Sequence, residues 1–555
     1  MPTRSIAVKV TPSPAARVSA DALALLVTEE DLEGEGAGAL RAVDLALHGH
    51  LRAAARAERF TGQPGQELEL ATLGRLPARR VHLLGLGTLE HAAEESRQNG
   101  HEPVRVALGR AARAAVQAGA RSLSVALPEL VRDDFPGAAR AAVEGALLGA
   151  YTFLRYKKAD PSRPPGLSSL LLALPATADR SKTLRREVAL AREVASAVAW
   201  ARDLVNLGPA DCTPTRLAKA ASELGRDKRL KVRIRGPQEI AALGMGLFLG
   251  VSRGSAEPPR LVEVGYRPRG AAGRRPPLVL VGKAITFDAG GLSLKPTDSM
   301  VSMHTDMAGS AAVLGAMRVV AALSPPFPVH AVLGACENMP GGRAYKPSDV
   351  LRAFDGQTVE VTNTDAEGRL VLGDVLAWAK EALRPAAMVD LATLTGACMV
   401  ALGTTTAGLF GPDGKLLEAI LSAARTAGED VWRMPLTPAL EEQLKSERAD
   451  MKNTGERWGS AITAAHFLHR FSGDLPWAHL DIAGPAHAQK DHDYVASGGT
   501  GFGVRTLVEL VRGWPEGPER PRPSPPLART AAPRRSPASA TPRAPARPRP
   551  RPRAR

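Results

Sequence analysis

The segment 363–370, which reads NTDAEGRL, constrains this chain more than any other. It sets Asp365, Glu367 and Arg369 close together between two apolar runs. Carboxylates two positions apart point to the same side of an extended segment, so Asp365 and Glu367 are expected to lie side by side. Two neighbouring negative charges are costly to assemble unless cations neutralise them. The chain must therefore fold in a way that brings cations to this segment.

Three further segments supply charged residues beside apolar runs. Lys283 and Asp288 follow a run that predicts a buried strand, where a lone lysine is rarely left unpaired. Asp306 precedes the stretch 308–323, which predicts a helix whose positive end tolerates an acid. The segment 388–397 predicts another strand that runs into a turn. Together they favour a metal site over a solvated acidic loop, the ordinary interpretation of an isolated D-x-E.

The charges of this set can be balanced by metal ions. Four carboxylates are available, from Asp288, Asp306, Asp365 and Glu367. Two divalent cations would neutralise them, as burial of the site requires. Hard oxygen ligands without a thiolate suit zinc, manganese or cobalt and argue against copper(I) or an iron–sulfur cluster. Lys283 could bind a metal only as a neutral amine, which a neighbouring dication would favour.

The motifs that carry these residues occur in a specific order along the chain. They read VGKAITFDAGG, SLKP, DMAGSAA, ENMPGGRAYKPSDV, NTDAEGRLVLGD, DLATLTGA and WAHLDIAG. In this order they resemble the leucyl aminopeptidase family of dizinc peptidases. The resemblance is dense from about residue 202 to Trp514, weak before about residue 180 and absent after Trp514.

The resemblance implies a role for each candidate ligand. Asp288 and Glu367 would bridge two divalent metal ions, zinc or manganese. Lys283 and Asp306 would complete the tighter of the two metal sites. Asp365 would complete the more exchangeable site. These roles come from the family pattern, and the charge balance agrees with them.

The same resemblance implies the catalytic residues and the substrate. Lys295 would polarise the scissile carbonyl, and Arg369 would hold a bicarbonate ion as general base toward a metal-bridging water. A metal-bound N-terminal amine would restrict cleavage to the first residue of peptides with a free N-terminus. The side-chain pocket for that residue would suit Leu or Met better than Asp or Glu, because its lining is apolar. That lining would consist of Met303, Thr393, Gly396 and Ala483.

Other motifs have simpler interpretations. His466 and His469 lie three apart on a predicted helix, and without a third ligand they are expected to be partly exposed helix histidines and not a metal pair. His304 is expected to face away from Asp306. The glycine-rich stretch 498–503 follows no strand, so a tight turn is favoured over a phosphate loop. Serine-hydrolase and nucleotide-hydrolase motifs are absent from the sequence.

Composition and pattern predict an α/β protein of two domains, each a mixed sheet flanked by helices. The chain has 555 residues and 44% hydrophobic residues, enough for more than one core. The predicted parts are an N-terminal assembly domain (1–178), a long linking helix (179–204) and a catalytic domain (205–514). Expected strands lie at 22–27, 80–86, 122–127, 168–174, 231–234, 260–264, 278–281, 329–335, 388–393 and 478–482. Expected helices lie at 103–118, 137–155 and 181–204.

The cellular setting is predicted from cysteines and hydropathy. The three cysteines, Cys212, Cys336 and Cys398, are too few and too far apart for a disulfide framework, which favours a reducing cytoplasm. The first ten residues alternate like a strand and lack the apolar core of a signal peptide. No apolar run of about 18 residues is present, so no membrane partner is expected.

The last 41 residues, 515–555, form a separate kind of segment. They contain 13 prolines, 11 arginines and two glutamates, and hence a net charge of +9. Such a Pro/Arg-rich tail cannot build a core and is expected to be disordered. It is either a solvated appendage or an arm for nucleic acid. The alternative function is therefore a nucleic-acid-binding hexamer with secondary peptidase activity, since the family resemblance implies a homohexamer.

Overall fold

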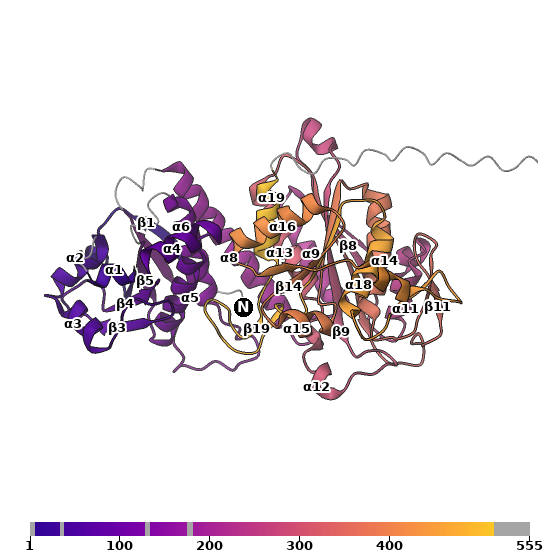
Figure 1. Ribbon diagram of the computed structural model, residues 1–555, viewed down its shortest axis with the longest axis horizontal. Coiled ribbons are helices and arrows are strands. Elements are labelled where there is room, and N and C mark those ends of the chain that lie inside the picture. The colour runs from indigo at the N-terminus through magenta and orange to yellow at the C-terminus, as the bar shows by residue number, and fades with distance from the viewer. Residues whose placement is uncertain (1–5, 34–37, 128–133, 175–180, 515–555) are drawn as a thin grey trace, which may run out of the picture. The chain divides into compact units, whose positions relative to one another are not determined.

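The computed structural model describes residues 6–33, 38–127, 134–174 and 181–514. In these residues two separate mixed α/β regions follow each other along the chain, each with a sheet flanked by helices, as predicted (Figure 1). The predicted disordered tail, 515–555, and the predicted boundary at 178 lie outside the described residues. The exact domain boundaries remain predictions.

The N-terminal region is built on a six-stranded sheet in the order β1-β6-β5-β2-β4-β3. All neighbouring pairs are parallel except β3 with β4. The central strand β2 has the sequence ALALLV and is buried at every residue, which explains its continuous apolar run. The strands are β1 (Ala7–Thr11), β2 (Ala22–Val27), β3 (Glu67–Ala71), β4 (Arg80–Gly85), β5 (Ser122–Ala126) and β6 (Ser169–Ala173).

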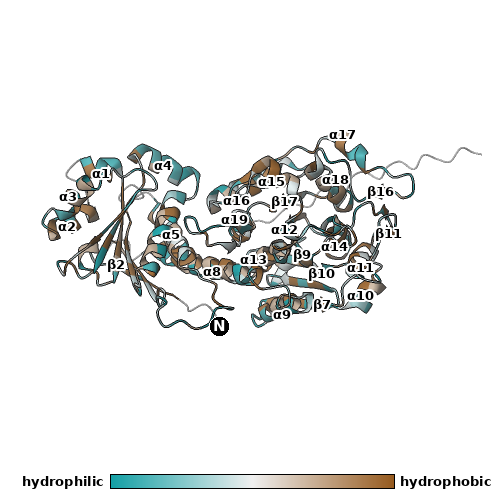
Figure 2. Ribbon diagram, turned by 90° about the horizontal axis from the view of Figure 1, so that it is seen from below, coloured by the Kyte–Doolittle hydropathy of each residue, from teal (hydrophilic) through white to brown (hydrophobic). Residues whose placement is uncertain are grey.

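Helices cover both faces of this sheet. One core contains residues of α4, α5 and α6, and a second core on the other face contains residues of α2 and α3. Figure 2 shows hydrophobic colour along the strands and hydrophilic colour on α1 and α4. The helices are η1 (Ala15–Arg17), α1 (Glu29–Glu33), α2 (Gly38–Ala46), α3 (His50–Ala57), α4 (Leu89–Gln98), α5 (Glu102–Gln117) and α6 (Phe135–Gly149).

The helix predicted to reach residue 155 ends earlier, so this part of the prediction is wrong. Helix α6 ends at Gly149, and Ala150 is its C-cap. The following Tyr151 is buried and donates its hydroxyl hydrogen to Asp203 Oδ1 at 2.8 Å. This long-range contact draws the chain out of the helix toward the linking helix.

The predicted linking helix is present as α8 (Lys182–Val205). The Ser181 side chain accepts a hydrogen bond from the Leu184 amide at 3.2 Å and caps its N-terminus. Residues of α8 belong to the cores of both regions, so the helix belongs structurally to each of them.

The second region is built on an eight-stranded sheet in the order β15-β14-β17-β13-β9-β10-β8-β7. Its four central strands, β17, β13, β9 and β10, are parallel. The strands are β7 (Leu230–Arg235), β8 (Arg260–Tyr266), β9 (Leu278–Asp288), β10 (Val329–Asn338), β13 (Ala387–Ala392), β14 (Ala407–Phe410), β15 (Val431–Arg433) and β17 (Trp477–Asp481). Strand β9 runs seven residues beyond the predicted end at 281, because Gly282 and Lys283 continue the ladder with β10.

Two layers of helices enclose this sheet. One core joins it to α8, α9, α13, α16 and α19, and the other joins it to α10, α11, α14 and α18. The main helices are α9 (Pro214–Leu224), α10 (Pro237–Ala242), α11 (Gly246–Ser252), α13 (Ala308–Leu323), α14 (Glu367–Leu383), α15 (Gly396–Leu402), α16 (Gly414–Ala427), α18 (Ser460–Ser472) and α19 (Val504–Gly513).

Short elements complete this region. Strands β11 (Val350–Arg352), β12 (Thr358–Glu360) and β16 (Met451–Lys452) form a three-stranded sheet, and β18 (His487–Ala488) pairs with β19 (Gly498–Gly499). The short helices are η3 (Gly270–Arg274), α12 (Thr297–Met300), η4 (Met303–Thr305), α17 (Pro438–Glu441) and η5 (Glu442–Leu444).

One stretch, Thr297–Leu323, is long and apolar enough by composition to cross a membrane. Most of its apolar window, 83%, is buried inside the protein. Helix α13, which makes up most of the stretch, packs on β9, β13 and α8. This is the pattern of a core helix.

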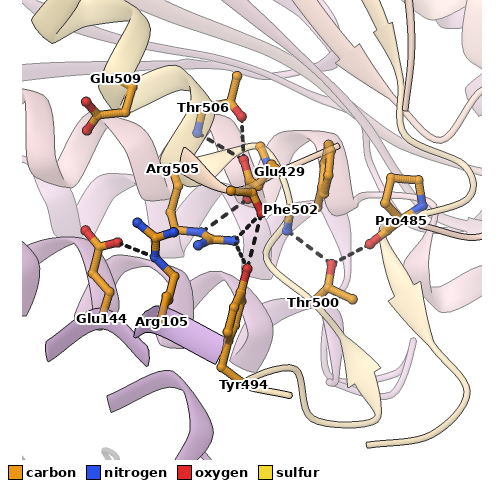
Figure 3. A network of polar contacts seen from close by, with 12 residues as sticks. Arg105, Glu144, Glu429, Pro485, Tyr494, Thr500, Phe502, Arg505, Thr506 and Glu509 are labelled. Carbon is orange, nitrogen blue, oxygen red and sulfur yellow. Dashed lines mark hydrogen bonds and ion pairs between the residues drawn. The ribbon is translucent and has the colours of Figure 1, made fainter. Parts of the chain in front are cut away.

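Buried ion pairs join the first region to the second. Arg140 of α6 pairs with Glu144 of the same helix at 2.9 Å and with Glu509 of α19. Figure 3 shows the surrounding network, in which Arg105 lies beside Glu144. Burial of these groups is tolerated because each charge has an opposite charge in contact.

Candidate metal centre

The candidate centre lies at the carboxyl edge of the four central parallel strands. Asp288 ends β9, Asn338 ends β10 and Asp481 ends β17, while Thr393 follows the end of β13. Ligand sites of open α/β sheets lie outside the carboxyl ends of their strands. The chain order therefore delivers widely separated polar residues to one edge.

A bulge in β9 turns Lys283 and Asp288 toward the same side. Five positions separate them, so in a regular strand their side chains would point to opposite faces. The pairing with β10 shifts so that Ile285 lies opposite Cys336 and Phe287 lies opposite Glu337, which leaves Thr286 as an extra residue. The extra residue restores a common face for the lysine and the aspartate.

Asp365 and Glu367 meet in a turn that leads into a helix, and the expected extended segment is wrong. Glu367 is the first residue of α14, and Asp365 lies in the turn before it. One carboxylate oxygen from each of Asp288, Asp365 and Glu367 lies within 4.8 Å of the other two. The predicted convergence of these carboxylates is therefore present, through a helix start and not through strand alternation.

Gly368 permits the close approach of Lys283 to helix α14. It lies inside α14, and a Cβ atom there would stand 2.5 Å from Lys283 Cε and 2.6 Å from Lys283 Nζ. Any larger residue would displace the lysine from its carboxylate partners.

Lys283 is a buried cation between two carboxylates. Its Nζ lies 2.9 Å from Asp306 Oδ1 and 3.0 Å from Glu367 Oε1, and it donates to the Thr393 carbonyl at 2.9 Å. Burial alone would lower the pKa of Lys283, but the carboxylates of Asp306 and Glu367 raise it above the ordinary value. In this arrangement the lysine occupies space between residues that could ligate a metal.

Lys295 is the second cation of the cluster. Its Nζ lies 2.9 Å from Asp288 Oδ2 and 2.5 Å from Asp365 Oδ1. Burial works against its charge, yet the carboxylates of Asp288 and Glu367 raise the pKa of Lys295. The loop that carries it depends on Gly290, whose φ of +85° favours glycine and whose amide donates to Asp288 Oδ1 at 2.8 Å.

The negative charge of the carboxylates in the cluster exceeds the positive charge of its lysines. Four of them face two lysines, and burial raises the pKa of Asp288, of Asp306 and of Asp365. Two buried oxygens, Asp306 Oδ2 and Glu367 Oε2, have no hydrogen-bond partner among the described residues. Buried carboxylate oxygens without donors fit hard divalent cations, so this donor set fits metal ions.

Asn338 and Tyr345 hold the segment that contains Asp365 in place through hydrogen bonds. Neither residue was predicted from the sequence. The Asn338 amide donates to Asp288 Oδ1 at 2.8 Å and to the Thr364 carbonyl at 2.9 Å. The Tyr345 hydroxyl donates to the same carbonyl at 2.7 Å. Both residues belong to the ENMPGGRAYKP motif at the end of a buried strand, and this position could have identified them from the sequence.

Arg369 is buried without an acidic partner in the described residues. Its side chain is 7% exposed, and Nη1 donates to the Asn453 carbonyl at 2.9 Å. It forms no ion pair within the described part of the chain. Burial lowers the pKa of Arg369 to about 10, against the opposing charges of Glu367 and Asp481. A buried guanidinium of this kind calls for an anion.

The four predicted pocket residues come from three segments at the same edge. Met303 begins η4, which packs on β9, and the Thr393 hydroxyl donates to Asp306 Oδ1 at 2.7 Å. Gly396 begins α15 and is exposed, and Ala483 is partly buried. The pocket itself remains a prediction.

The other histidine and glycine motifs lie outside the cluster. His466 is buried and not partly exposed as expected, and its Nε2 contacts the Thr437 carbonyl at 3.0 Å. His469 stacks on Trp477, and His304 packs edge-on against His487. Gly498–Gly499 forms strand β19, paired with β18, and not the expected tight turn, while a turn at 502–503 leads into α19. All three cysteines are free and buried.

Comparison with known proteins then assigns the family. The model of the cytosol aminopeptidase family, catalytic domain, matches residues 199–508, and the model of the N-terminal domain of the same family matches residues 24–160. This chain belongs to the cytosol aminopeptidase family. It is a peptidase, an enzyme that hydrolyses peptide bonds, and specifically an aminopeptidase.

Relatives of the cytosol aminopeptidase family match over nearly their whole length. A probable cytosol aminopeptidase of Geobacter sp. (strain M21) is 44% identical over 470 residues, which is 84% of this chain and 93% of that protein. One from Cyanothece sp. (strain PCC 7425 / ATCC 29141) is 41% identical over 507 residues, 91% and 99% of the two chains.

Solved structures of similar fold cover both regions. A mutant of tomato leucine aminopeptidase superposes with a TM-score of 0.81 at 34% identity, over 91% of this chain and 96% of its own. The bottromycin maturation enzyme BotP in complex with Mn has a TM-score of 0.75 at 37% identity, over 89% and 99%. The resemblance stated from sequence motifs is confirmed.

Proposed function

We propose that this aminopeptidase uses two divalent cations, zinc or manganese, to release N-terminal Leu- or Met-type residues from peptides. One observation carries the proposal. Four carboxylates, those of the buried Asp288, Asp306 and Glu367 and of the half-buried Asp365, converge on two lysines. Two of their oxygens, on Asp306 and Glu367, have no hydrogen-bond partner in the described residues. The manganese complex of the similar BotP structure adds support.

The residues that would hold the cations are those that the family resemblance implies, and the charge count agrees with them. Asp288, Glu367, Asp306 and Asp365, with Lys283 as a neutral amine, would hold the two ions. Divalent cations supply Lewis acidity toward the scissile carbonyl and lower the pKa of water.

The chain's own residues supply position and charge. Lys295 reaches two of the carboxylates and would stabilise negative charge that develops on the carbonyl oxygen. Arg369 is buried and has no acidic partner among the described residues, and it would hold bicarbonate as the general base that receives a proton during attack. Asn453 keeps the guanidinium in place through its carbonyl.

Metal content tests the ligand assignment independently of activity. Asp288→Asn and Glu367→Gln each remove a negative charge, and each should lower the metal bound per chain, measured by mass spectrometry of the purified protein. Asp390→Asn is the matched control, since Asp390 is a buried carboxylate that pairs with His479. Full metal content and turnover in either ligand variant would refute the assignment.

Substrate panels test the aminopeptidase specificity. Dipeptides that begin with Leu or Met should be cleaved faster than those that begin with Asp or Glu, because no cation lines the proposed pocket. N-acetylated Leu peptides should be inert, and chelators should stop hydrolysis. Efficient cleavage of blocked peptides would contradict a site that needs the free amine.

We also propose that the protein is a cytoplasmic homohexamer. Within each chain, the proposed domain boundaries lie at residues 178, 204 and 514. Support comes from the family resemblance and from relatives named cytosol aminopeptidases. Light scattering coupled to gel filtration would measure the oligomer size. A monomer at working concentration would overturn the hexamer.

A further inference from the structure

A single buried carboxylate, that of Asp481, joins two segments of the proposed side-chain pocket. Asp481 ends β17 and is 1% exposed. β17 pairs in parallel with β13, and Asp481 lies opposite Ala392. Both loops that leave these strands therefore start beside this carboxylate.

The hydrogen bonds of Asp481 go to those two loops. Its Oδ1 accepts from the amides of Leu394 at 3.1 Å, Thr395 at 3.4 Å and Ala483 at 3.2 Å. Its Oδ2 accepts from the Thr395 hydroxyl at 2.7 Å. Thr395 in turn accepts from the Cys398 amide at 3.1 Å and caps α15.

These loops contain three of the four proposed pocket residues. Thr393 and Gly396 flank the pair that Asp481 holds, and Ala483 is held directly through its amide. Asp481 forms no ion pair with either lysine of the cluster in the described residues, although its negative charge acts on the buried Arg369. Charge-assisted bonds to backbone amides are stronger than neutral ones, so one carboxylate can fix both loops.

We propose that Asp481 is a positioning residue that sets the width of the side-chain pocket. It holds the loop 393–396 and Ala483 at a fixed separation. The inference rests on the proposed pocket and names the residue that determines its shape. Loss of the carboxylate would let the loops separate, and the pocket would then discriminate less between Leu and Ala.

The test compares Asp481→Ala with Asp481→Asn. The alanine variant removes every acceptor. The asparagine variant keeps one oxygen for the amides, and its NH2 group can donate to the Thr395 hydroxyl, which is able to accept. Measured quantities are kcat and KM for Leu-Gly and Ala-Gly, and bound metal.

We expect Asp481→Ala to lower the Leu-Gly to Ala-Gly ratio of kcat/KM by about tenfold or more, within the range that apolar pockets supply. Most of this change should lie in KM for Leu-Gly, with metal content unchanged. Asp481→Asn should keep most of the preference. The matched control Asp390→Asn alters a buried carboxylate whose contacts are to Trp477 and His479, and should keep the wild-type ratio.

Other results of these measurements would contradict the proposal. An unchanged ratio in Asp481→Ala, or a loss of metal with an unchanged ratio, would overturn the positioning role. Should that variant fail to fold, Thr395→Val, which removes only the hydroxyl contact, must show a smaller fall in the ratio or the inference fails. A wild-type enzyme without preference for Leu-Gly would instead overturn the proposed pocket, and this inference with it.

Discussion

Lys295 shows how one side chain can contact the candidate ligands without being one of them. Its amine reaches Asp288 and Asp365, yet it lies on the loop after Gly290 and Gly291, both with positive φ. Its side chain is 15% exposed, more than that of Lys283 at 4%. Of the two lysines, Lys295 is therefore the one placed to meet a substrate.

Replacement of Lys295 separates catalysis from metal binding. Lys295→Ala should lower kcat by about two to three orders of magnitude, typical of the loss of one oxyanion-stabilising donor. Metal content should stay at the wild-type level, because the carboxylates remain. Steady-state kinetics and elemental analysis on one preparation measure both quantities.

Lys415→Ala provides the control for this experiment, since Lys415 is exposed on α16 far along the chain from the cluster. It should match the wild type in both readouts. Metal loss in Lys295→Ala would show that the lysine supports the ligands, and near-normal kcat would remove it from catalysis.

At the scale of elements, Asp374 joins three parts of the fold. It lies in α14, is fully buried, and accepts from the amide of Phe248 at 2.9 Å and from that of Phe354 at 2.8 Å. Helix α11 has no side-chain cap of its own at Met245. A carboxylate from a distant helix thus satisfies the first turn of α11.

Asp374 should make stability depend on pH. Burial raises the pKa of Asp374 to about 7, against the lowering effect of its backbone hydrogen bonds. The folded-state pKa then exceeds the unfolded value, so folding takes up a proton between about pH 4 and pH 7. This contribution to stability is present at low pH and is lost as pH rises through about 7.

Asp374→Asn cannot ionise and lacks one acceptor oxygen. Its thermal unfolding midpoint should lie below that of the wild type at about pH 5, and the gap should narrow at about pH 8. Calorimetry of both proteins at the two pH values measures it. A gap that stays constant or widens with pH would contradict an elevated pKa at this site.

Much of the fold and the site followed from local pattern, and the rest depended on tertiary contacts. Strand β2 matches its prediction because its apolar run is continuous, and helix α13 matches because small and apolar residues dominate its sequence. The bulge at Thr286 could not be predicted, since it depends on pairing with β10. Asn453 was also missed, because a buried asparagine that accepts from Thr362 and Asn363 leaves no periodic signal.

At the scale of the whole molecule, α8 and a buried polar network connect the two regions. The Tyr494 hydroxyl accepts a hydrogen bond from Arg505 Nη2 of α19 at 2.9 Å (Figure 3). It also donates to Glu102 Oε1 of α5 at 2.7 Å. Arg202 of α8 donates to the Thr500 carbonyl at 2.8 Å. The loop before α19 is therefore held by side chains from both regions.

Removal of one member of this network should weaken the contact between the two regions. Arg140→Met leaves Glu144 and Glu509 with fewer cationic partners in a buried setting, where breaking a pair costs about 3–5 kcal/mol. The thermal midpoint should fall, with a separate transition for the N-terminal region. Lys445→Met is the control, because its pair with Glu442 is exposed and such pairs contribute about 0–1 kcal/mol. Equal thermal midpoints for both variants would show that the network does not stabilise the contact between the two regions.

The Pro/Arg-rich segment 515–555 carries a large share of the positive charge of the whole molecule. It follows α19, the last helix of the described residues, and supplies none of the candidate ligands. Truncation at about residue 515 should therefore leave dipeptide hydrolysis and oligomer size unchanged. Its net charge of +9 should still bind phosphates, with counterion release and hence a steep loss of affinity as salt rises.

Full-length and truncated protein should therefore differ in binding to a labelled DNA duplex at low salt, with little dependence on sequence. In a hexamer six copies of the segment would act together and strengthen binding further. Fluorescence anisotropy at two salt concentrations measures the difference. Equal binding by both proteins would leave a solvated appendage. Lost peptidase activity after truncation would place the end of the catalytic domain beyond Trp514.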